Sequence, residues 1–181
     1  MKATGIVRRI DDLGRVVVPK EIRRTLRIRE GDPLEIFTDR EGEIILKKYS
    51  PIGELGQFAK QYADSLALTT GHIVCIADRD QIIATSGSSK KELMSKTISK
   101  EMEDIINDRE TVIATKEDKN FINITNDAED FTSQVISPII TEGDAIGAVI
   151  ILSKEDKIKL SETEVKLATT ASHFLGKQME Q

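Results

Sequence analysis

Two runs rich in apolar, β-prone residues, joined by a polar turn, give the start of the chain the pattern expected of a β-hairpin. Residues 5–10 and 15–18 are short β-prone runs, and residues 11–14 between them supply two Asp and one Gly. Asp can bond backbone amides in a turn, and Gly can take the positive φ that a tight turn needs. The pattern therefore predicts a hairpin over residues 5–18.

A short helix and a second hairpin are predicted next. Pro19 ends the strand and opens a helical segment in which Ile22 and Leu26 lie four residues apart on one face. Residues 34–38 and 43–48 are again β-prone and flank a polar turn that contains Gly. The first fifty residues thus predict a β-β-α-β-β unit.

The rest of the chain carries the pattern of a folded α+β domain. Apolar residues recur at helical spacing over residues 54–68, and a capping box formed by Ser161 and Glu164 marks the start of a final helix. Between these helices the sequence predicts strands over residues 72–78, 81–85, 111–115, 121–124, 133–141 and 145–152.

The distribution of charge supports a division of the chain. Residues 1–50 carry 12 basic and 9 acidic side chains, whereas residues 51–181 carry 14 basic and 22 acidic ones. The whole chain has a net charge of −5, so nucleic-acid binding by its entire surface is not expected. We expect a basic domain over residues 1–50, a linking and dimerisation helix over residues 51–70, and a further domain over residues 71–181 that ends in a dimerisation helix.

Nine Lys or Arg and only three acidic residues lie between Lys2 and Arg29. Such a local excess of positive charge favours a polyanionic partner. Most of these residues are arginines, and a guanidinium binds phosphate bidentately, stays charged, and can reach guanine edges or a narrowed minor groove. The alternative is a solvated basic face that forms weak surface salt bridges with Glu21, Glu30 or Asp32.

The first fifty residues hold too few large apolar groups to form a stable core alone. Domains below roughly 70–80 residues usually need a metal, disulfides or a partner chain. The sequence has one cysteine, Cys75, and two distant histidines, His72 and His173, so neither a disulfide framework nor a metal site is expected. Exchange of hairpins between two chains would double the core and pair the exposed strand edges. We therefore expect an obligate dimer.

Several segments of the N-terminal part together resemble the swapped-hairpin barrel of AbrB-type bacterial transition-state regulators. They are Gly5-Ile-Val-Arg8, Asp12-Leu-Gly-Arg15-Val-Val-Val-Pro19, Ile22-Arg-Arg-Thr-Leu26 and the run from Leu34 to Lys48. The resemblance implies an interleaved homodimer that docks on double-stranded DNA and reads its shape and flexibility more than a rigid base code. By position it assigns DNA contact to Arg8, Arg15, Arg23 and Arg24, with Lys2, Arg9, Lys20, Lys47 and Lys48 as neighbours of phosphate groups.

The segment from Pro138 to Val149 is similar to the last hairpin of GAF domains, and the predicted order of helices and strands agrees with that fold. This resemblance implies a sensory α+β domain with a pocket between the sheet and its overlying helices. It points to a small-molecule effector that the sequence does not identify, and to no known cofactor. Many GAF domains also dimerise through their terminal helices.

The final helix carries two apolar stripes. Val165, Ala168, Leu175 and Met179 follow one stripe, and Phe174 belongs to the other. One helix with two apolar faces needs two partners, and a homotetramer would result if the N-terminal and C-terminal dimers use different partner chains. The alternative is that both stripes widen a single core face. The expected oligomerisation residues are Leu55, Phe58, Tyr62, Val165, Ala168, Leu175 and Met179.

Three classes of function fit these features. The first, which the resemblance to AbrB-type regulators implies, is a DNA-binding transcriptional regulator, an activator or repressor of developmental or sporulation genes, with a ligand-sensing C-terminal domain. The second is an antitoxin-like DNA-binding autoregulator, although residues 51–181 are patterned as a folded domain rather than a disordered tail. The third, an enzyme, is the weakest because Cys75 lies in an apolar run without a convergent set of His, Asp or Glu. With no secretory segment or spanning apolar run, we expect a cytoplasmic, nucleoid-associated protein without a membrane partner.

Overall fold

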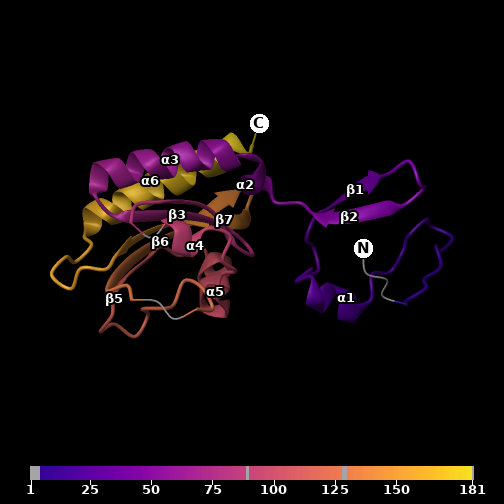
Figure 1. Ribbon diagram of the computed structural model, residues 1–181, viewed down its shortest axis with the longest axis horizontal. Helices are drawn as coiled ribbons and strands as arrows, with labels where there is room; N and C mark the ends of the chain where they lie inside the picture. The colour runs from indigo at the N-terminus through magenta and orange to yellow at the C-terminus, as the bar shows by residue number, and fades with distance from the viewer. Residues whose placement is uncertain (1–4, 89, 128–129, 181) are drawn as a thin grey trace. The chain divides into compact units, whose positions relative to one another are not determined.

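The computed structural model describes residues 5–88, 90–127 and 130–180 (Figure 1). Within it the chain forms two compact units, Met1–Tyr49 and Ser50–Gln181. Both helices and strands occur, in agreement with the predicted α+β class. In the part of the chain that is described, no helix combines the length and the apolar character needed to cross a membrane.

The N-terminal unit contains one short helix and one hairpin. Helix α1, Lys20–Thr25, begins directly after the buried Pro19, which occupies its N-cap position. Strands β1, Leu34–Thr38, and β2, Ile44–Lys48, pair in antiparallel fashion. The predicted short helix and the predicted second hairpin are therefore confirmed.

The predicted first hairpin has its turn but not its strands. The amide of Asp11 donates to the carbonyl of Arg15 at 3.0 Å, and Gly14 takes a φ of 75°, as the turn chemistry requires. Residues 5–10 and 15–18 are not strands, because no described segment of the chain forms a ladder with them. A strand needs a neighbouring segment that fills its hydrogen bonds. The prediction of two strands here is wrong for the single chain.

The C-terminal unit is built on a five-stranded antiparallel sheet with the strand order β4-β3-β7-β6-β5. The strands are β3 (Ile73–Asp78), β4 (Ile82–Ser86), β5 (Val112–Thr115), β6 (Ser133–Thr141) and β7 (Asp144–Ser153). The helices are α2 (Pro51–Glu54), α3 (Gly56–Thr70), α4 (Lys90–Leu93), α5 (Lys100–Asp108) and α6 (Glu162–Gln178). The pairing of β6 with β7 confirms the predicted hairpin, and the capping box at the start of α6 is also confirmed.

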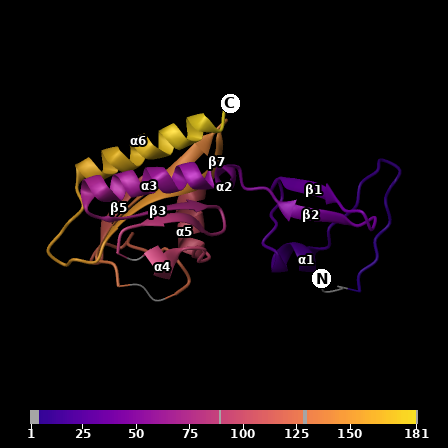
Figure 2. The ribbon, with the colours of Figure 1, turned by 45° about the horizontal axis from the view of Figure 1, so that its top comes forward.

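Helices cover both faces of this sheet (Figures 1 and 2). On one face α3 and α6 lie side by side, and Val74 and Ile76 of β3 belong to the core beneath them. On the other face α4 and α5 cover a second core that includes Cys75. Successive side chains of a strand point to opposite faces, so the apolar run in β3 is buried on both sides.

Residues 121–124, predicted as a strand, do not join the sheet. The buried Gln134 of β6 holds them instead, because its side-chain amide donates to the Ile122 carbonyl at 2.9 Å and accepts from the Ile122 amide at 3.0 Å. A side chain thus takes the place that a neighbouring strand would occupy. The prediction of a strand at this point is wrong.

Candidate nucleic-acid interface

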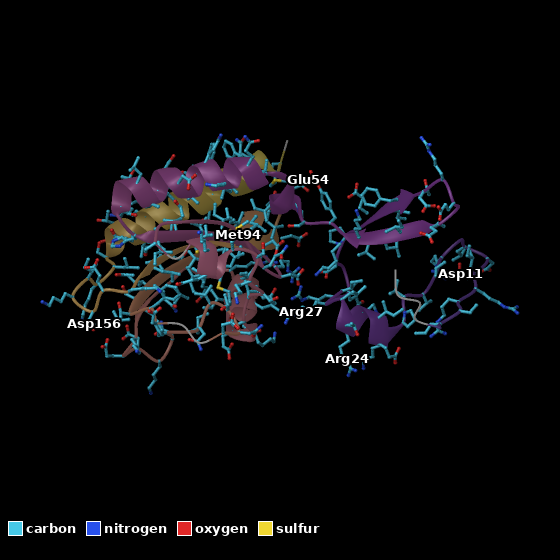
Figure 3. The ribbon with its side chains drawn as sticks, in the orientation of Figure 1. Asp11, Arg24, Arg27, Glu54, Met94 and Asp156 are labelled. Atoms are coloured by element: carbon cyan, nitrogen blue, oxygen red, sulfur yellow. The ribbon has the colours of Figure 1, made fainter. Side chains whose placement is uncertain are left out.

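The arginines predicted to contact DNA lie on two parts of the N-terminal unit. Arg8 and Arg15 flank the turn at residues 11–14, and Arg23 and Arg24 lie on α1. Arg8, Arg15 and Arg24 are exposed and Arg23 is half-buried. Figure 3 shows the side chain of Arg24 extending from the helix toward solvent. All four arginines are therefore accessible to a partner.

A carboxylate holds one of these arginines. Asp11 Oδ2 accepts a hydrogen bond from Arg15 Nε at 2.8 Å, and Asp11 Oδ1 accepts from the backbone amides of Leu13 at 3.0 Å and Arg15 at 2.8 Å. These bonds, above all the one from the Arg15 backbone, hold the pKa of Asp11 below its ordinary value of 3.8. The turn therefore carries an ionised carboxylate that directs the Arg15 side chain.

The two lysines at the end of β2 differ in their surroundings. Lys47 is exposed, and its Nζ lies 4.6 Å from the centre of the Phe37 ring. Lys48 Nζ donates to the carbonyl of Arg27 at 2.8 Å and lies 3.2 Å from the carboxylate of Asp32. Lys48 thus fastens the end of β2 to the residues that follow α1, and its ammonium is engaged within the chain.

The remaining predicted phosphate neighbours are Arg9, Lys20 and Lys2. Arg9 follows Arg8 and is exposed, and Lys20, also exposed, is the first residue of α1. Lys2 lies outside the described residues.

Three carboxylates gather in the turn between β1 and β2. Oxygens of Asp39, Glu41 and Glu43 lie within 4.8 Å of one another, as they would around a cation. However, Asp39 Oδ1 already accepts hydrogen bonds from the amides of Glu41 and Glu43, at 3.0 and 2.9 Å. The geometry of Asp39 is that of an Asp closing a turn.

The residues predicted to form oligomer contacts divide into three groups. Ala168 and Leu175 are completely buried in the core between α6 and the sheet, so they serve the packing of their own unit. Phe58 and Tyr62 of α3 each lie against Phe174 of α6, with ring centres 5.8 and 5.6 Å apart. Phe58 is 36% exposed and Phe174 is 40% exposed, so this aromatic cluster also faces solvent. The remaining members, Leu55, Val165 and Met179, are half-buried, as is Tyr62.

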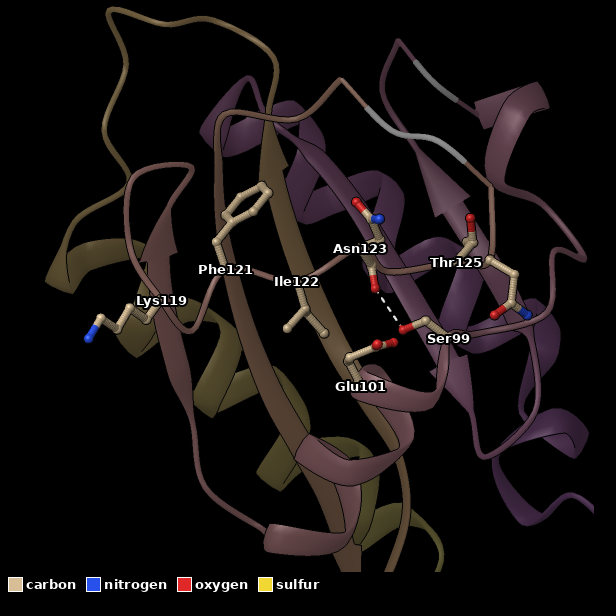
Figure 4. A pocket seen from close by; sticks show the side chains of 8 residues that line it. Ser99, Glu101, Lys119, Phe121, Ile122, Asn123 and Thr125 are labelled. Carbon is tan, nitrogen blue, oxygen red and sulfur yellow. Dashed lines mark hydrogen bonds between the residues drawn. The ribbon is translucent and has the colours of Figure 1, made fainter.

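A hollow of about 470 Å³ opens beside the start of α5 (Figure 4). Ser99 caps this helix by accepting from the Met102 amide at 3.0 Å, and its hydroxyl donates to the carbonyl of Asn123 at 2.7 Å. In Figure 4 the Lys119 side chain points away from the other labelled residues. The lining residues are Ser99, Glu101, Lys119, Phe121, Ile122, Asn123, Thr125 and Asn126. The hollow therefore offers hydroxyl and amide groups, one carboxylate and one aromatic ring.

A chain of hydrogen bonds joins the rim of this hollow to the first residue of the C-terminal unit. The side-chain amide of Asn126 donates to the Ile98 carbonyl at 3.4 Å, and the Ile98 amide donates to the Asp80 carbonyl at 3.0 Å. The Asp80 amide donates to Asp78 Oδ1 at 2.7 Å, and the hydroxyl of Ser50 donates to Asp78 Oδ2 at 3.0 Å. The buried Asp78 therefore connects the turn between β3 and β4 with the start of α2.

Two family models match this chain. The model of the C-terminal part of stage V sporulation protein T, described as a transcription factor, matches residues 54–180. The model described as antidote-toxin recognition MazE, a bacterial antitoxin, matches residues 7–54.

The chain is similar to two regulatory proteins of Bacillus subtilis (strain 168). Stage V sporulation protein T is 58% identical over 182 residues, which cover 100% of each chain. The transition state regulatory protein AbrB is 49% identical over 85 residues, which cover 46% of this chain and 88% of AbrB. The second GAF domain of DevS from Mycobacterium smegmatis has the same fold as the C-terminal unit, with a TM-score of 0.54 at 10% identity over 68% of this chain and 91% of that one.

Proposed function

The chain belongs to the family of the stage V sporulation protein T transcription factors, and we propose that its N-terminal unit binds double-stranded DNA through Arg8, Arg15, Arg23 and Arg24. The observation that carries this proposal is the accessibility of these arginines in a chain whose net charge is −5. For Arg8, Arg23 and Arg24, the described residues supply no side-chain hydrogen bond or ion pair. Guanidinium groups without an internal partner match the phosphates and base edges of DNA.

The N-terminal unit works, in this proposal, as an interleaved dimer. Large apolar side chains of the unit are exposed, among them Val7 at 88% and Ile44 at 69%. A second copy that pairs with residues 5–10 and 15–18 would bury such groups and complete the missing strands. It would also place two sets of arginines side by side, as a two-fold DNA site requires.

The C-terminal unit is proposed to hold a small effector in the hollow beside α5 and to join dimers into a tetramer. The lining of the hollow supports a polar ligand with a flat or apolar part, because Phe121 lies among amide and hydroxyl groups. The aromatic cluster of Phe58, Tyr62 and Phe174 supports the oligomer contact, because aromatic residues are enriched at interfaces between proteins.

The effector would influence DNA binding through Asp78. A ligand that moves Asn126 or Ile98 also acts on the turn between β3 and β4, to which Ser50 is bonded. Ser50 is the first residue of the C-terminal unit, so such a movement would reach the point in the chain where the two units are joined. Effector binding would then change the affinity of the protein for DNA, and DNA binding would change its affinity for the effector by the same factor.

The targets proposed are sporulation or other developmental genes, which the protein would activate or repress. This assignment rests on the similarity to stage V sporulation protein T over the whole chain. A protein bound at the promoter of such a gene could activate or repress it through the same DNA contact.

An antitoxin is the second candidate, favoured by the match of residues 7–54 to the MazE model. An antitoxin of this kind needs a tail that wraps its toxin, and such a tail is disordered when free. Residues 50–181 instead form a compact unit with two apolar cores. Limited proteolysis separates the two: rapid digestion of this whole region would favour the antitoxin.

DNA binding is tested with the full-length protein and a duplex that it selects from a random-sequence pool. Arg24→Ala should raise the dissociation constant about tenfold, since loss of one good arginine contact costs about 1–3 kcal/mol. Arg40→Ala is the matched control, because Arg40 is an exposed arginine of the same unit outside the proposed set. Equal effects of the two changes would mean a diffuse attraction between charges, and no effect of Arg24→Ala would contradict the proposal at this residue.

A further inference from the structure

Asp11 makes two kinds of contact at one turn. Its Oδ1 accepts the backbone amides of Leu13 and Arg15, whereas its Oδ2 accepts the Nε–H of Arg15. The Asp11 side chain is 35% exposed and the Arg15 side chain is 69% exposed. The carboxylate therefore fixes both the shape of the loop and the direction of a guanidinium that reaches solvent.

The contact leaves a defined part of Arg15 available. A guanidinium carries five N–H donors in a rigid plane, and a bond at Nε leaves the two terminal nitrogens for a partner. This terminal pair is a fork that can bind a guanine edge or a phosphate bidentately. Among the described residues, Arg8, Arg23 and Arg24 have no such carboxylate. Arg15 is thus the oriented member of the four.

We propose that Asp11 is a positioning residue that orients Arg15 for sequence-selective contact with DNA. This inference rests on the proposed function, because it requires Arg15 to touch DNA. Holding the side chain in place before binding reduces the conformational entropy that is lost on contact. The carboxylate also repels phosphates wherever Arg15 finds no matching group, so it favours cognate over unrelated DNA.

Asp12 provides a matched control. It is the next residue, it is exposed, and no described residue forms a side-chain hydrogen bond or ion pair with it. Replacement by Asn removes the same charge from the same turn at either position. At position 11 the Asn oxygen can still accept the two backbone amides, so the loop keeps its shape.

The experiment compares two dissociation constants of the full-length protein. One is for a duplex selected by the wild type from a random-sequence pool, and the other is for the unselected pool; their ratio measures selectivity. Asp11→Asn should lower this selectivity about tenfold, which is the discrimination that one bidentate contact with a base provides. Asp12→Asn should change this ratio by no more than about twofold, because the free-energy effects of independent sites add to within about that factor. In an Arg15→Ala background, Asp11→Asn should leave the ratio unchanged.

Arg15→Lys is a second variant that keeps the test decisive if Asp11→Asn does not fold. It retains the positive charge and the Asp11 turn but lacks the Nε–H and the planar fork, so it should narrow the ratio as Asp11→Asn does. Equal changes for Asp11→Asn and Asp12→Asn would overturn the positioning role. The positioning role would also be overturned if Asp11→Asn changed the ratio in the Arg15→Ala background. If Arg15→Ala leaves both dissociation constants as they were, the proposed DNA contact of Arg15 itself fails.

Discussion

The ammonium of Lys48 lies 3.2 Å from the carboxylate of Asp32, whose side chain is only 5% exposed. Lys48 also donates to the carbonyl of Arg27, which follows α1 in the left-handed conformation with a φ of 53°. Asp32 in turn accepts the amide of Arg29 at 2.8 Å. We therefore interpret Lys48 as a residue that stabilises the end of the arginine-bearing helix rather than as a phosphate neighbour.

Lys48→Met should lower the stability of the N-terminal unit. The change removes a charged donor from Asp32 and Arg27, and hydrogen bonds to charged groups contribute about 1.5–3 kcal/mol each. Urea unfolding at one fixed protein concentration measures this loss. Lys47→Met is the control and should cost less, because Lys47 is exposed and its ammonium lies over the face of Phe37 in a cation–π pair. Equal losses for the two lysines would contradict this interpretation.

Gly176→Ala should destabilise the C-terminal unit. A Cβ at Gly176 would overlap the carbonyl oxygen of Ile140, where α6 packs against β6. Such overpacking typically costs about 1–3 kcal/mol, which thermal unfolding detects as a lower midpoint. Gly56→Ala, at the start of α3, is the control: a Cβ there meets no atom, and Ala favours a helix over Gly by up to about 1 kcal/mol. A Gly176→Ala variant as stable as the wild type would show that the helix can move away from the sheet.

Phe174→Glu should separate the proposed tetramer into dimers. The change places a charge in the exposed aromatic cluster while leaving the N-terminal unit untouched. Light scattering should give four chains per particle for the wild type and two for the variant. His173→Glu, at an exposed position one residue earlier, should keep four. Four chains in both variants would remove this cluster from the oligomer contact.

The capping box of α6 should make stability depend on pH. Burial raises the pKa of Glu164, but hydrogen bonds from the Ser161 hydroxyl and amide outweigh it and hold the pKa below its ordinary value of 4.5. The ionised group therefore stabilises the folded unit above pH 4.5, and this contribution is lost as the pH falls through the lower folded-state pKa. Glu164→Gln should lower the free energy of unfolding at neutral pH, and its difference from the wild type should shrink in acid. A difference that is constant with pH would contradict the role of the charge.

The elements that could be predicted are those whose hydrogen-bond partners lie nearby in the same chain. The strands β6 and β7 follow one another across a short turn, and the box of Ser161 and Glu164 is local, so pattern alone identifies them. Residues 5–10 carry a β pattern as clear as these, but they lack a partner strand in the single chain. Residues 121–124 fail for a different reason, because the side chain of Gln134 supplies the hydrogen bonds of the Ile122 backbone in place of a neighbouring strand.

The candidate site was predictable in its arginines and not in the residues that hold them. Arg8, Arg15, Arg23 and Arg24 stand out through charge and through resemblance to a family. The Asp11 contact has a weak local signal, an Asp four residues before an Arg across a turn. The contact of Lys48 with Asp32 has none, because it exists only once β2 returns beside the end of α1.

The central claim, that arginines of the N-terminal unit bind DNA, is tested most directly by salt dependence. The dissociation constant of the full-length protein for its selected duplex is measured over a range of salt concentrations for the wild type and for Arg8→Ala, Arg15→Ala, Arg23→Ala and Arg24→Ala. Each change should weaken binding and make the slope of log affinity against log salt shallower by about one for each lost phosphate contact. Unchanged affinity and unchanged slope in all four variants would contradict the claim.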